Sequence, residues 1–240
     1  MDPAKSTSAS GLQTVVDVIL APSTAFERLR TAPTWGWAFL ITLVLYALAS
    51  YLITPAIVHG FQTGWPAMVA GDPRMAQLSP DKLQQALSFT LWILHFTWLL
   101  SIVGTPVAIF FTTIVMLVFN AVGRGSASFS MLWATAANVS VPTLGLAGAV
   151  LAVIVLLRGA DSFGSTMAVT EALPSLAWLV PSAGAKVVAF LSAFSVFQIW
   201  GAVLLYIAMR VTARVGAVPA VLTALLLPIC AGIFASFGAH

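Results

Sequence analysis

Residues 83–123 read LQQALSFTLWILHFTWLLSIVGTPVAIFFTTIVMLVFNAVG, a stretch without any Asp, Glu, Lys or Arg. Crossing the hydrocarbon core of a bilayer takes about 20 apolar residues as a helix, or about ten as a barrel strand. The stretch has ample length for one such helix. Because backbone N–H and C=O groups in lipid need partners within the chain, an uncharged run of this length predicts a membrane-spanning helix.

The composition of the whole chain agrees with this interpretation. Of 240 residues, 60% are hydrophobic and 7% are charged, and the mean hydropathy is +1.02. A soluble domain usually has about a quarter of its residues charged and under half apolar. The composition therefore excludes a soluble enzyme, a nucleic-acid binder and a disordered tail. The net charge of +3 is too small for a phosphate-binding surface, so we interpret the basic residues as signals of membrane topology.

Other charge-free stretches divide the rest of the chain, at residues 31–71, 125–157, 187–209 and 215–240. Each has room for one spanning helix. We therefore predict an all-α polytopic membrane protein with five transmembrane helices, near residues 36–58, 88–119, 129–157, 186–209 and 217–237. Residues 1–34 are predicted to form a cytoplasmic N-terminal segment, and residues 35–240 the transmembrane domain.

The basic residues decide the predicted orientation. With the N-terminus inside, six basic residues lie on the cytoplasmic side: Lys5, Arg28, Arg30, Arg124, Arg210 and Arg214. Four lie on the other side: Arg74, Lys82, Arg158 and Lys186. The positive-inside rule favours a cytoplasmic N-terminus and an external C-terminus, because Arg124, Arg210 and Arg214 of the first group occupy the tightest connections. We expect a location in the bacterial inner membrane, with longer outer loops at about 59–87 and 158–185.

A helical pattern precedes the first predicted span. Apolar residues recur at helical spacing: Leu12, Val15, Val16 and Ile19. Pro22 interrupts the pattern, and Thr24 and Glu27 then have the spacing of a capping box. The sequence therefore predicts two short amphipathic helices in this segment.

These two helices have two alternative placements. On the cytoplasmic membrane interface, Ala25, Phe26 and Leu29 would point into the bilayer edge, while Arg28 and Arg30 would face anionic headgroups as anchors. Alternatively, the helices pack against the inner end of the bundle. The apolar pattern is the same in both cases.

Two motifs resemble those of a known family. Residues 22–26 read PSTAF, and a second proline, Pro33, leads into the first span. Residues 123–129 read GRGSASF and precede a third span that contains Pro142. In both motifs the chain is similar to prokaryotic members of the Yip-domain family, the Ypt-interacting proteins. The resemblance covers about residues 18–235 in architecture.

The resemblance implies an integral membrane domain with a cytoplasmic N-terminus. The candidate interfacial or partner contacts are the motif residues Pro22, Phe26, Arg28, Arg30 and Pro33. Eukaryotic relatives are associated with Rab-type GTPases, vesicle traffic and membrane shaping. The chain departs from their pattern because it has no Asp-Leu-Tyr-Gly-Pro motif, so a GTPase partner is not carried over.

The ionisable residues argue against chemistry inside the membrane. All seven acidic residues lie outside the predicted spans, which disfavours an acid dyad or a proton relay. The histidines His59, His95 and His240 lack the spacing of metal ligands, and Cys230 is the single cysteine. We predict no enzyme activity, no cofactor and no nucleic-acid partner. His95 is either a structural residue among aromatics or a group that titrates near neutral pH.

Prolines and amides inside the predicted spans suggest a second possible function, a small cavity for a solute. Pro106, Pro142 and Pro228 remove backbone hydrogen bonds, so kinks are expected. Two of them could frame a small cavity, as broken helices do in transporters. The candidate cavity residues are Pro106, Asn120, Asn138, Pro142 and Gln198. In the other interpretation, the amides merely hydrogen-bond between helices.

Together these features predict a non-enzymatic integral membrane protein of Yip-domain type. It would organise the membrane, serve a trafficking-like role or bind partners through its N-terminal face. Its partners would be the lipid bilayer, other proteins or a second copy of the chain. The alternatives are a small permease or channel for a neutral or passively moving solute, and a subunit of a larger membrane complex.

Overall fold

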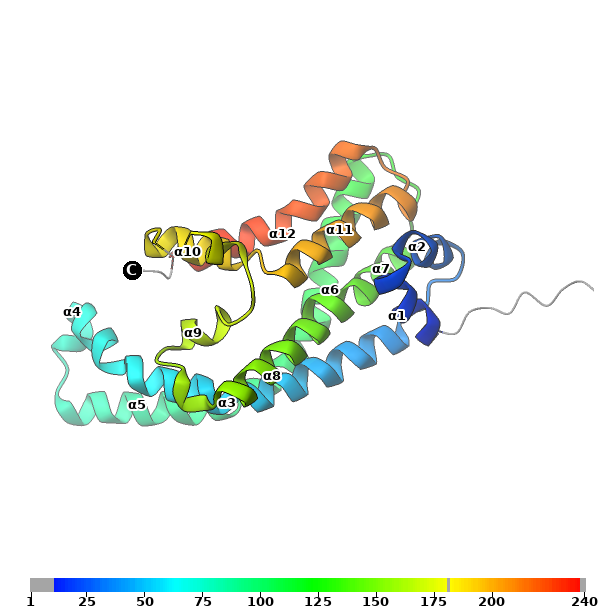
Figure 1. Ribbon diagram of the computed structural model, residues 1–240. Coiled ribbons are helices and arrows are strands. Elements are labelled where there is room, and N and C mark those ends of the chain that lie inside the picture. Colours follow the sequence, from blue (N-terminus) through cyan, green and yellow to red (C-terminus); the bar gives the residue numbers. More distant parts are fainter. Residues whose placement is uncertain (1–10, 181, 238–240) are drawn as a thin grey trace, which may run out of the picture.

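The computed structural model describes residues 11–180 and 182–237, which form helices joined by turns. Within these residues, four helices are long and apolar enough to cross a membrane. They are α3 (Gly36–Gly71), α6 (Thr97–Val122), the continuous helix Phe129–Arg158 and α12 (Ala217–Phe237). Figure 1 shows them side by side with the shorter helix α11. The all-helical membrane architecture is confirmed, but the number of long helices is four instead of the predicted five.

The third predicted span is one helix with a local change of winding. It begins as α7 (Phe129–Ser140), passes through a π-helical turn, η1 (Val141–Leu146), and continues as α8 (Ala147–Arg158). Pro142 lies in the π turn. Since proline offers no N–H to the helix ladder, the wider turn accommodates the residue without ending the helix.

The fourth predicted span, 186–209, is broken. It consists of α10 (Ala185–Ser192) and α11 (Val196–Val211), and α11 has only 16 residues. The physical reason is the hydrogen bonding around Ser195, which combines a local cap with bonds to residues 174–176. The Ser195 hydroxyl accepts a hydrogen bond from the Gln198 backbone N–H, and the Val196 N–H donates to the Pro174 carbonyl oxygen. These bonds take the place of helical backbone hydrogen bonds at the break. After it, α11 runs back to the turn at 212–216, where α12 begins.

The first outer loop is largely helical. Helix α3 continues to Gly71, past the predicted end of its span, with Pro55 and Pro66 inside it. Its 36 residues measure about 54 Å, more than a hydrocarbon core of about 30 Å. The short helix α4 (Pro73–Ala76) and then α5 (Pro80–His95) follow. Helix α5 ends at His95 and α6 begins at Thr97, so Phe96 separates the loop helix from the helix of the second span.

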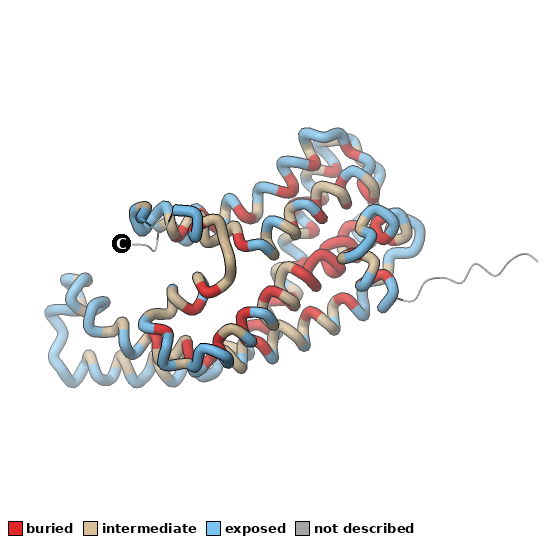
Figure 2. Tube along the Cα trace, in the orientation of Figure 1, coloured by how far each residue is buried: buried red, intermediate tan, exposed pale blue. Residues whose placement is uncertain are grey.

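The opposite end of the bundle is covered by α1 (Gly11–Leu20) and α2 (Pro22–Thr31). We call this the capped end, and it includes the turns at 123–128 and 212–216. The largest buried cluster begins here and continues between α6, α7, α11 and α12, and Figure 2 shows the buried residues of these helices. On the other side, η2 (Ala160–Ser162), α9 (Thr166–Thr170) and η3 (Leu176–Leu179) complete the connection to α10.

Candidate functional site

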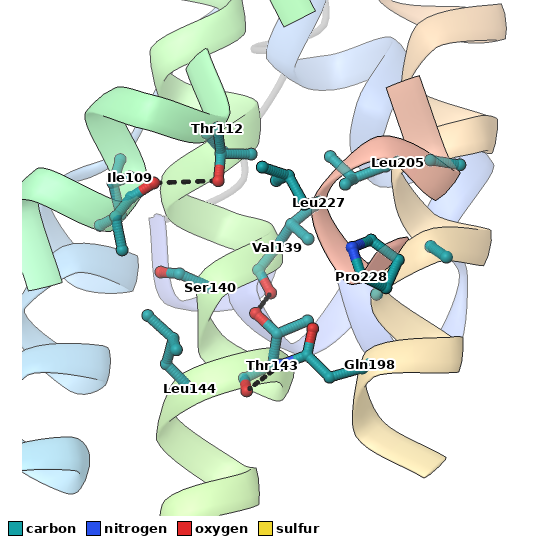
Figure 3. Close-up of a pocket in the computed structure, with 15 residues that line it drawn as sticks. Ile109, Thr112, Val139, Ser140, Thr143, Leu144, Gln198, Leu205, Leu227 and Pro228 are labelled. Carbon is teal, nitrogen blue, oxygen red and sulfur yellow. Dashed lines mark hydrogen bonds between the residues drawn. The ribbon is translucent and has the colours of Figure 1, made fainter. Parts of the chain in front are cut away.

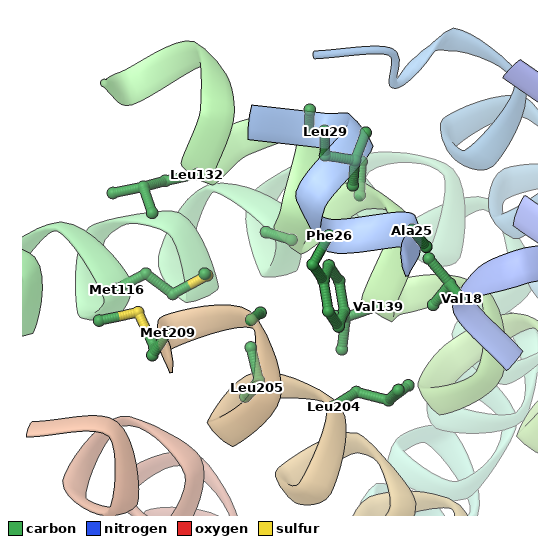
Figure 4. Close-up of a cluster of buried hydrophobic side chains, with 14 of the residues drawn as sticks. Val18, Ala25, Phe26, Leu29, Met116, Leu132, Val139, Leu204, Leu205 and Met209 are labelled. Carbon is green, nitrogen blue, oxygen red and sulfur yellow. The ribbon is translucent and has the colours of Figure 1, made fainter. Parts of the chain in front are cut away.

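The N-terminal helices are part of the protein core. Ala25, Phe26 and Leu29 are fully buried, and Figure 4 shows them facing side chains of the long helices and α11. The Thr212 hydroxyl, just after α11, donates a hydrogen bond to the Phe26 carbonyl oxygen at 3.2 Å. Of the two placements left open by the sequence, packing against the bundle is therefore correct. The expectation that these three side chains point into the bilayer is wrong.

The charged residues of α2 differ in what they contact. The Arg28 guanidinium donates to the Asp17 carboxylate of α1 at 2.7 Å, so Arg28 links the two helices. Arg30 is half-exposed and remains available at the surface. The predicted capping box is absent, because α2 already begins at Pro22 after Ala21. Thr24 and Glu27 therefore lie within the helix.

One face of helix α1 packs against the bundle, and the opposite face is exposed. Thr14, Val15 and Val18 are buried against the bundle. Along the opposite face lies a line of apolar side chains, the α1 ridge: Leu12, Val16 and Leu20, which are 44%, 51% and 76% exposed. The spacing of four residues places them on one side of the helix. This ridge was not predicted, because the sequence pattern assigned Leu12, Val15 and Val16 to the same face.

The α1 ridge is close to the apolar outer surface of α3. The Cα–Cβ direction of Gly11 points at Trp37, with 3.0 Å between an added Cβ and the Trp37 ring. From Trp37 an exposed apolar stripe continues along α3 through Leu40, Val44 and Leu48. Such a stripe on a long apolar helix faces lipid. The start of the α1 ridge therefore lies next to this apolar stripe at the capped end.

Pro33 belongs to a different feature of the capped end. It lines a hollow of about 320 Å³ with Trp35, Phe129, Ser130 and Trp133. The Trp133 ring meets Trp35 edge-on at 6.1 Å and stacks on Phe129 at 6.3 Å. Pro22, by contrast, is half-exposed at the first position of α2. The sequence pointed to Pro33 but not to Trp133, which only the fold brings near.

Two of the candidate intramembrane amides hold the backbone together. Asn120 donates to the Ala127 carbonyl oxygen at 3.1 Å and accepts from the Ala127 N–H at 3.3 Å, which closes the α6–α7 turn. Asn138 is buried and donates to the carbonyl oxygens of Thr34 and Ala134. Neither amide is among the residues that line the cavity around Gln198, and their bonds fit a structural role.

Gln198 does line a cavity, which Figure 3 shows between α6, α7–η1, α11 and α12. Its volume is about 110 Å³, and its walls are mainly apolar. The Gln198 side-chain amide donates to the Thr143 carbonyl oxygen at 3.4 Å. Pro228 also lines the cavity. Pro142 and Pro106 do not line it, although they lie one residue before Thr143 and two residues before Ala108, which do.

The remaining candidate groups are separate from these features. The His95 Nδ1 lies 2.7 Å from the Leu91 carbonyl oxygen of its own helix, at the exposed end of α5. Within residues 11–180 and 182–237, no three or more His, Cys, Asp or Glu side chains gather as a metal site. Lys5 and His240 lie outside the described residues.

Fold and surface define an all-helical integral membrane protein. Over 198 residues, 81% of this chain and 76% of the relative, the sequence is 26% identical to "Membrane protein YknW" of Bacillus subtilis (strain 168). That name says only that the relative is a membrane protein, in agreement with the four long apolar helices. No protein-family model matches the chain, and no solved structure matches it. The Yip-domain resemblance therefore stays a prediction.

Proposed function

We propose that the chain is a non-enzymatic membrane protein of Yip-domain type that organises the bilayer through its capped end. In this proposal the capped end faces the cytoplasm of a bacterial cell and the C-terminus lies outside, in the inner membrane. The observation that carries the proposal is the α1 ridge. It consists of apolar side chains on a helix that the bundle holds at the level where the long helices end.

A helix held in this way has a physical effect on lipid. Val15 and Val18 attach α1 to the protein, so the helix is not free to leave the surface. The exposed side chains of Leu12, Val16 and Leu20 then enter the boundary between headgroups and acyl chains. Because the insertion is shallow and on one leaflet only, it enlarges that leaflet and favours curved bilayers.

Two leucines with equal exposure provide the matched test. Leu20 on the α1 ridge and Leu179 in η3, outside the capped end, are both 76% exposed. The wild type and the variants Leu20→Gln and Leu179→Gln are reconstituted into mixed large and small vesicles, and the distribution of protein is measured. We expect the wild type and Leu179→Gln to concentrate in small vesicles and Leu20→Gln to lose that preference. Equal distributions for all three proteins would contradict the proposal.

The cavity around Gln198 supports a second candidate function, passive permeation of water or a small neutral solute. Its volume of about 110 Å³ holds about three waters. A second hollow of about 310 Å³ between α3 and α6 shares the wall residues Ala108 and Leu144 with it. The two hollows would form a path if these two side chains moved.

Flux measurements test this second function. Proteoliposomes are compared with protein-free vesicles for shrinkage under osmotic stress and for uptake of glycerol. We expect Gln198→Leu to reduce flux severalfold, and Gln84→Leu, on the exposed face of α5, to leave it unchanged. Wild-type vesicles that are no more permeable than protein-free vesicles would eliminate this candidate.

A further inference from the structure

Two arginines at the capped end have an uncommon backbone conformation. Among the described non-glycine residues, only Arg124 and Arg214 have a positive φ, at 53° and 57°. This left-handed conformation is costly for a residue with a Cβ and is usually occupied by glycine or asparagine. Gly123 and Gly125 flank Arg124, yet the strained position between them holds an arginine. Strain of this kind accumulates at functional sites.

The two turns that hold these arginines form one structure. The Ser126 N–H, two residues after Arg124, donates to the carbonyl oxygen of Ala213, which directly precedes Arg214, at 3.0 Å. Gly125 packs so tightly that an added Cβ would lie 2.7 Å from that same oxygen. Residues next to one arginine thus touch residues next to the other. Both arginine side chains are exposed.

The surroundings of this arginine pair are positively charged. Residues 120–130 and 208–220 contain no Asp or Glu. Arg210 adds a third guanidinium, whose Nη1 donates to the Val215 carbonyl oxygen at 2.7 Å. Helix α2, which packs on α11, carries Glu27 and Arg30, and also Arg28, whose charge is paired with that of Asp17. The small net charge of the chain predicted no phosphate-binding surface, whereas the fold brings the turns that hold Arg124 and Arg214 together, close to Arg210.

The position of the pair identifies the ligand. Arg124 follows the last turn of α6, and Arg214 lies between α11 and α12, so both lie where long apolar helices end. Lipid phosphates occupy this level of a bilayer. Arginine presents its N–H groups as a planar fork that matches phosphate oxygens. We propose that Arg124 and Arg214 together bind the phosphate of an anionic phospholipid headgroup, a site beyond the membrane-organising function proposed above.

Glycine variants at the two strained positions separate an effect on lipid binding from an effect on folding. The full chain is purified in neutral detergent, and its melting temperature is measured with phosphatidylglycerol or phosphatidylcholine added. We expect phosphatidylglycerol to stabilise the wild type more than phosphatidylcholine does. The double variant Arg124→Gly/Arg214→Gly should lose this difference, with at least tenfold weaker lipid binding. Without lipid it should melt no lower than the wild type, because glycine accepts the left-handed conformation.

Three further proteins complete the design. Arg124→Asn/Arg214→Asn tolerates the backbone conformation without the charge, and it replaces the glycine pair if that variant does not fold. Arg124→Lys/Arg214→Lys should retain part of the lipid effect, and Arg74→Gln on α4 should retain all of it. A neutral variant that keeps the full phosphatidylglycerol effect would overturn the proposal. Equal protection of the wild type by inorganic phosphate would also overturn it, since the ligand would then be free phosphate.

Discussion

The capped end and helix α5 use the same kinds of residues in opposite ways. At the capped end, Phe26 of α2 is fully buried. In α5, where no residue is buried, Phe89 is 62% exposed and stacks only on its own helix neighbour Trp92, with ring centroids 6.4 Å apart. Both segments are helices beside long spans. Only one of them is part of the core.

The difference shows that amphipathic pattern does not decide what a helix contributes to a membrane protein. Apolar side chains of α2 have protein partners, and a hydrogen bond from Thr212 fixes its backbone. The aromatic side chains of α5 are left for lipid or another molecule. We therefore expect substitutions at the capped end to change the stability of the bundle, and equivalent substitutions in α5 to leave it unchanged.

The largest expected effect comes from the two phenylalanines. Phe26→Ala should reduce the free energy of unfolding by about 3–5 kcal/mol, because it removes a fully buried ring and leaves a cavity. Phe89→Ala is the matched control and should change little. Denaturation in mixed micelles measures both values. Equal losses for the two variants would remove the distinction between the two regions.

A smaller loss is expected from overpacking the turn at the capped end. An added Cβ at Gly125 would lie 2.7 Å from the Ala213 carbonyl oxygen and would clash with the Asn120 side chain. Gly125→Ala should therefore cost about 1–3 kcal/mol. Gly104→Ala in α6 has open space around the new methyl group and serves as the control. A stable Gly125→Ala variant would mean that the two turns do not touch.

The hydrogen bond between α2 and the α11–α12 turn should contribute less. Thr212→Val keeps the shape but removes the hydroxyl that donates to the Phe26 carbonyl oxygen. We expect a loss of about 0.5–1.5 kcal/mol. Thr170→Val in α9, where the exposed hydroxyl bonds to its own helix, should have a smaller effect in the same unfolding experiment. A larger loss of unfolding free energy for Thr170→Val than for Thr212→Val would contradict the packing of α2 against the bundle.

The smallest expected effect is that of the ion pair between α1 and α2. The side chains of Arg28 and Asp17 are 24% and 22% exposed, so water screens their attraction. A double-mutant cycle with Arg28→Gln and Asp17→Asn should give a coupling of about 0.2–1 kcal/mol that decreases with added salt. A coupling that salt does not change would indicate a pair more deeply buried than the structure shows.

The sequence predicted the elements that charge and length determine. The last span was predicted at 217–237 and is observed as Ala217–Phe237, and the third begins at Phe129 as expected. It did not predict the break in the fourth span, because the bonds around Ser195 involve residues 174–176, far away along the chain. It also could not decide the environment of Phe26, since lipid and protein interior are both apolar.

The candidate sites were predictable to a similar extent. Gln198 was found because an amide in an apolar run is unusual, and it does line a cavity. Arg124 and Arg214 were identified only as topology signals. Neighbouring glycines marked the first turn, but nothing local indicates a positive φ at an arginine or the contact between turns some 90 residues apart.

Hydrogen–deuterium exchange in nanodiscs tests most directly whether the capped end belongs to the core. The compared peptides cover α2 (Pro22–Thr31), α5 (Pro80–His95) and the core helix α7 (Phe129–Ser140). The structure predicts that amides of α2 exchange nearly as slowly as those of α7 and clearly more slowly than those of α5. Exchange of α2 as fast as that of α5 would contradict a docked capped end.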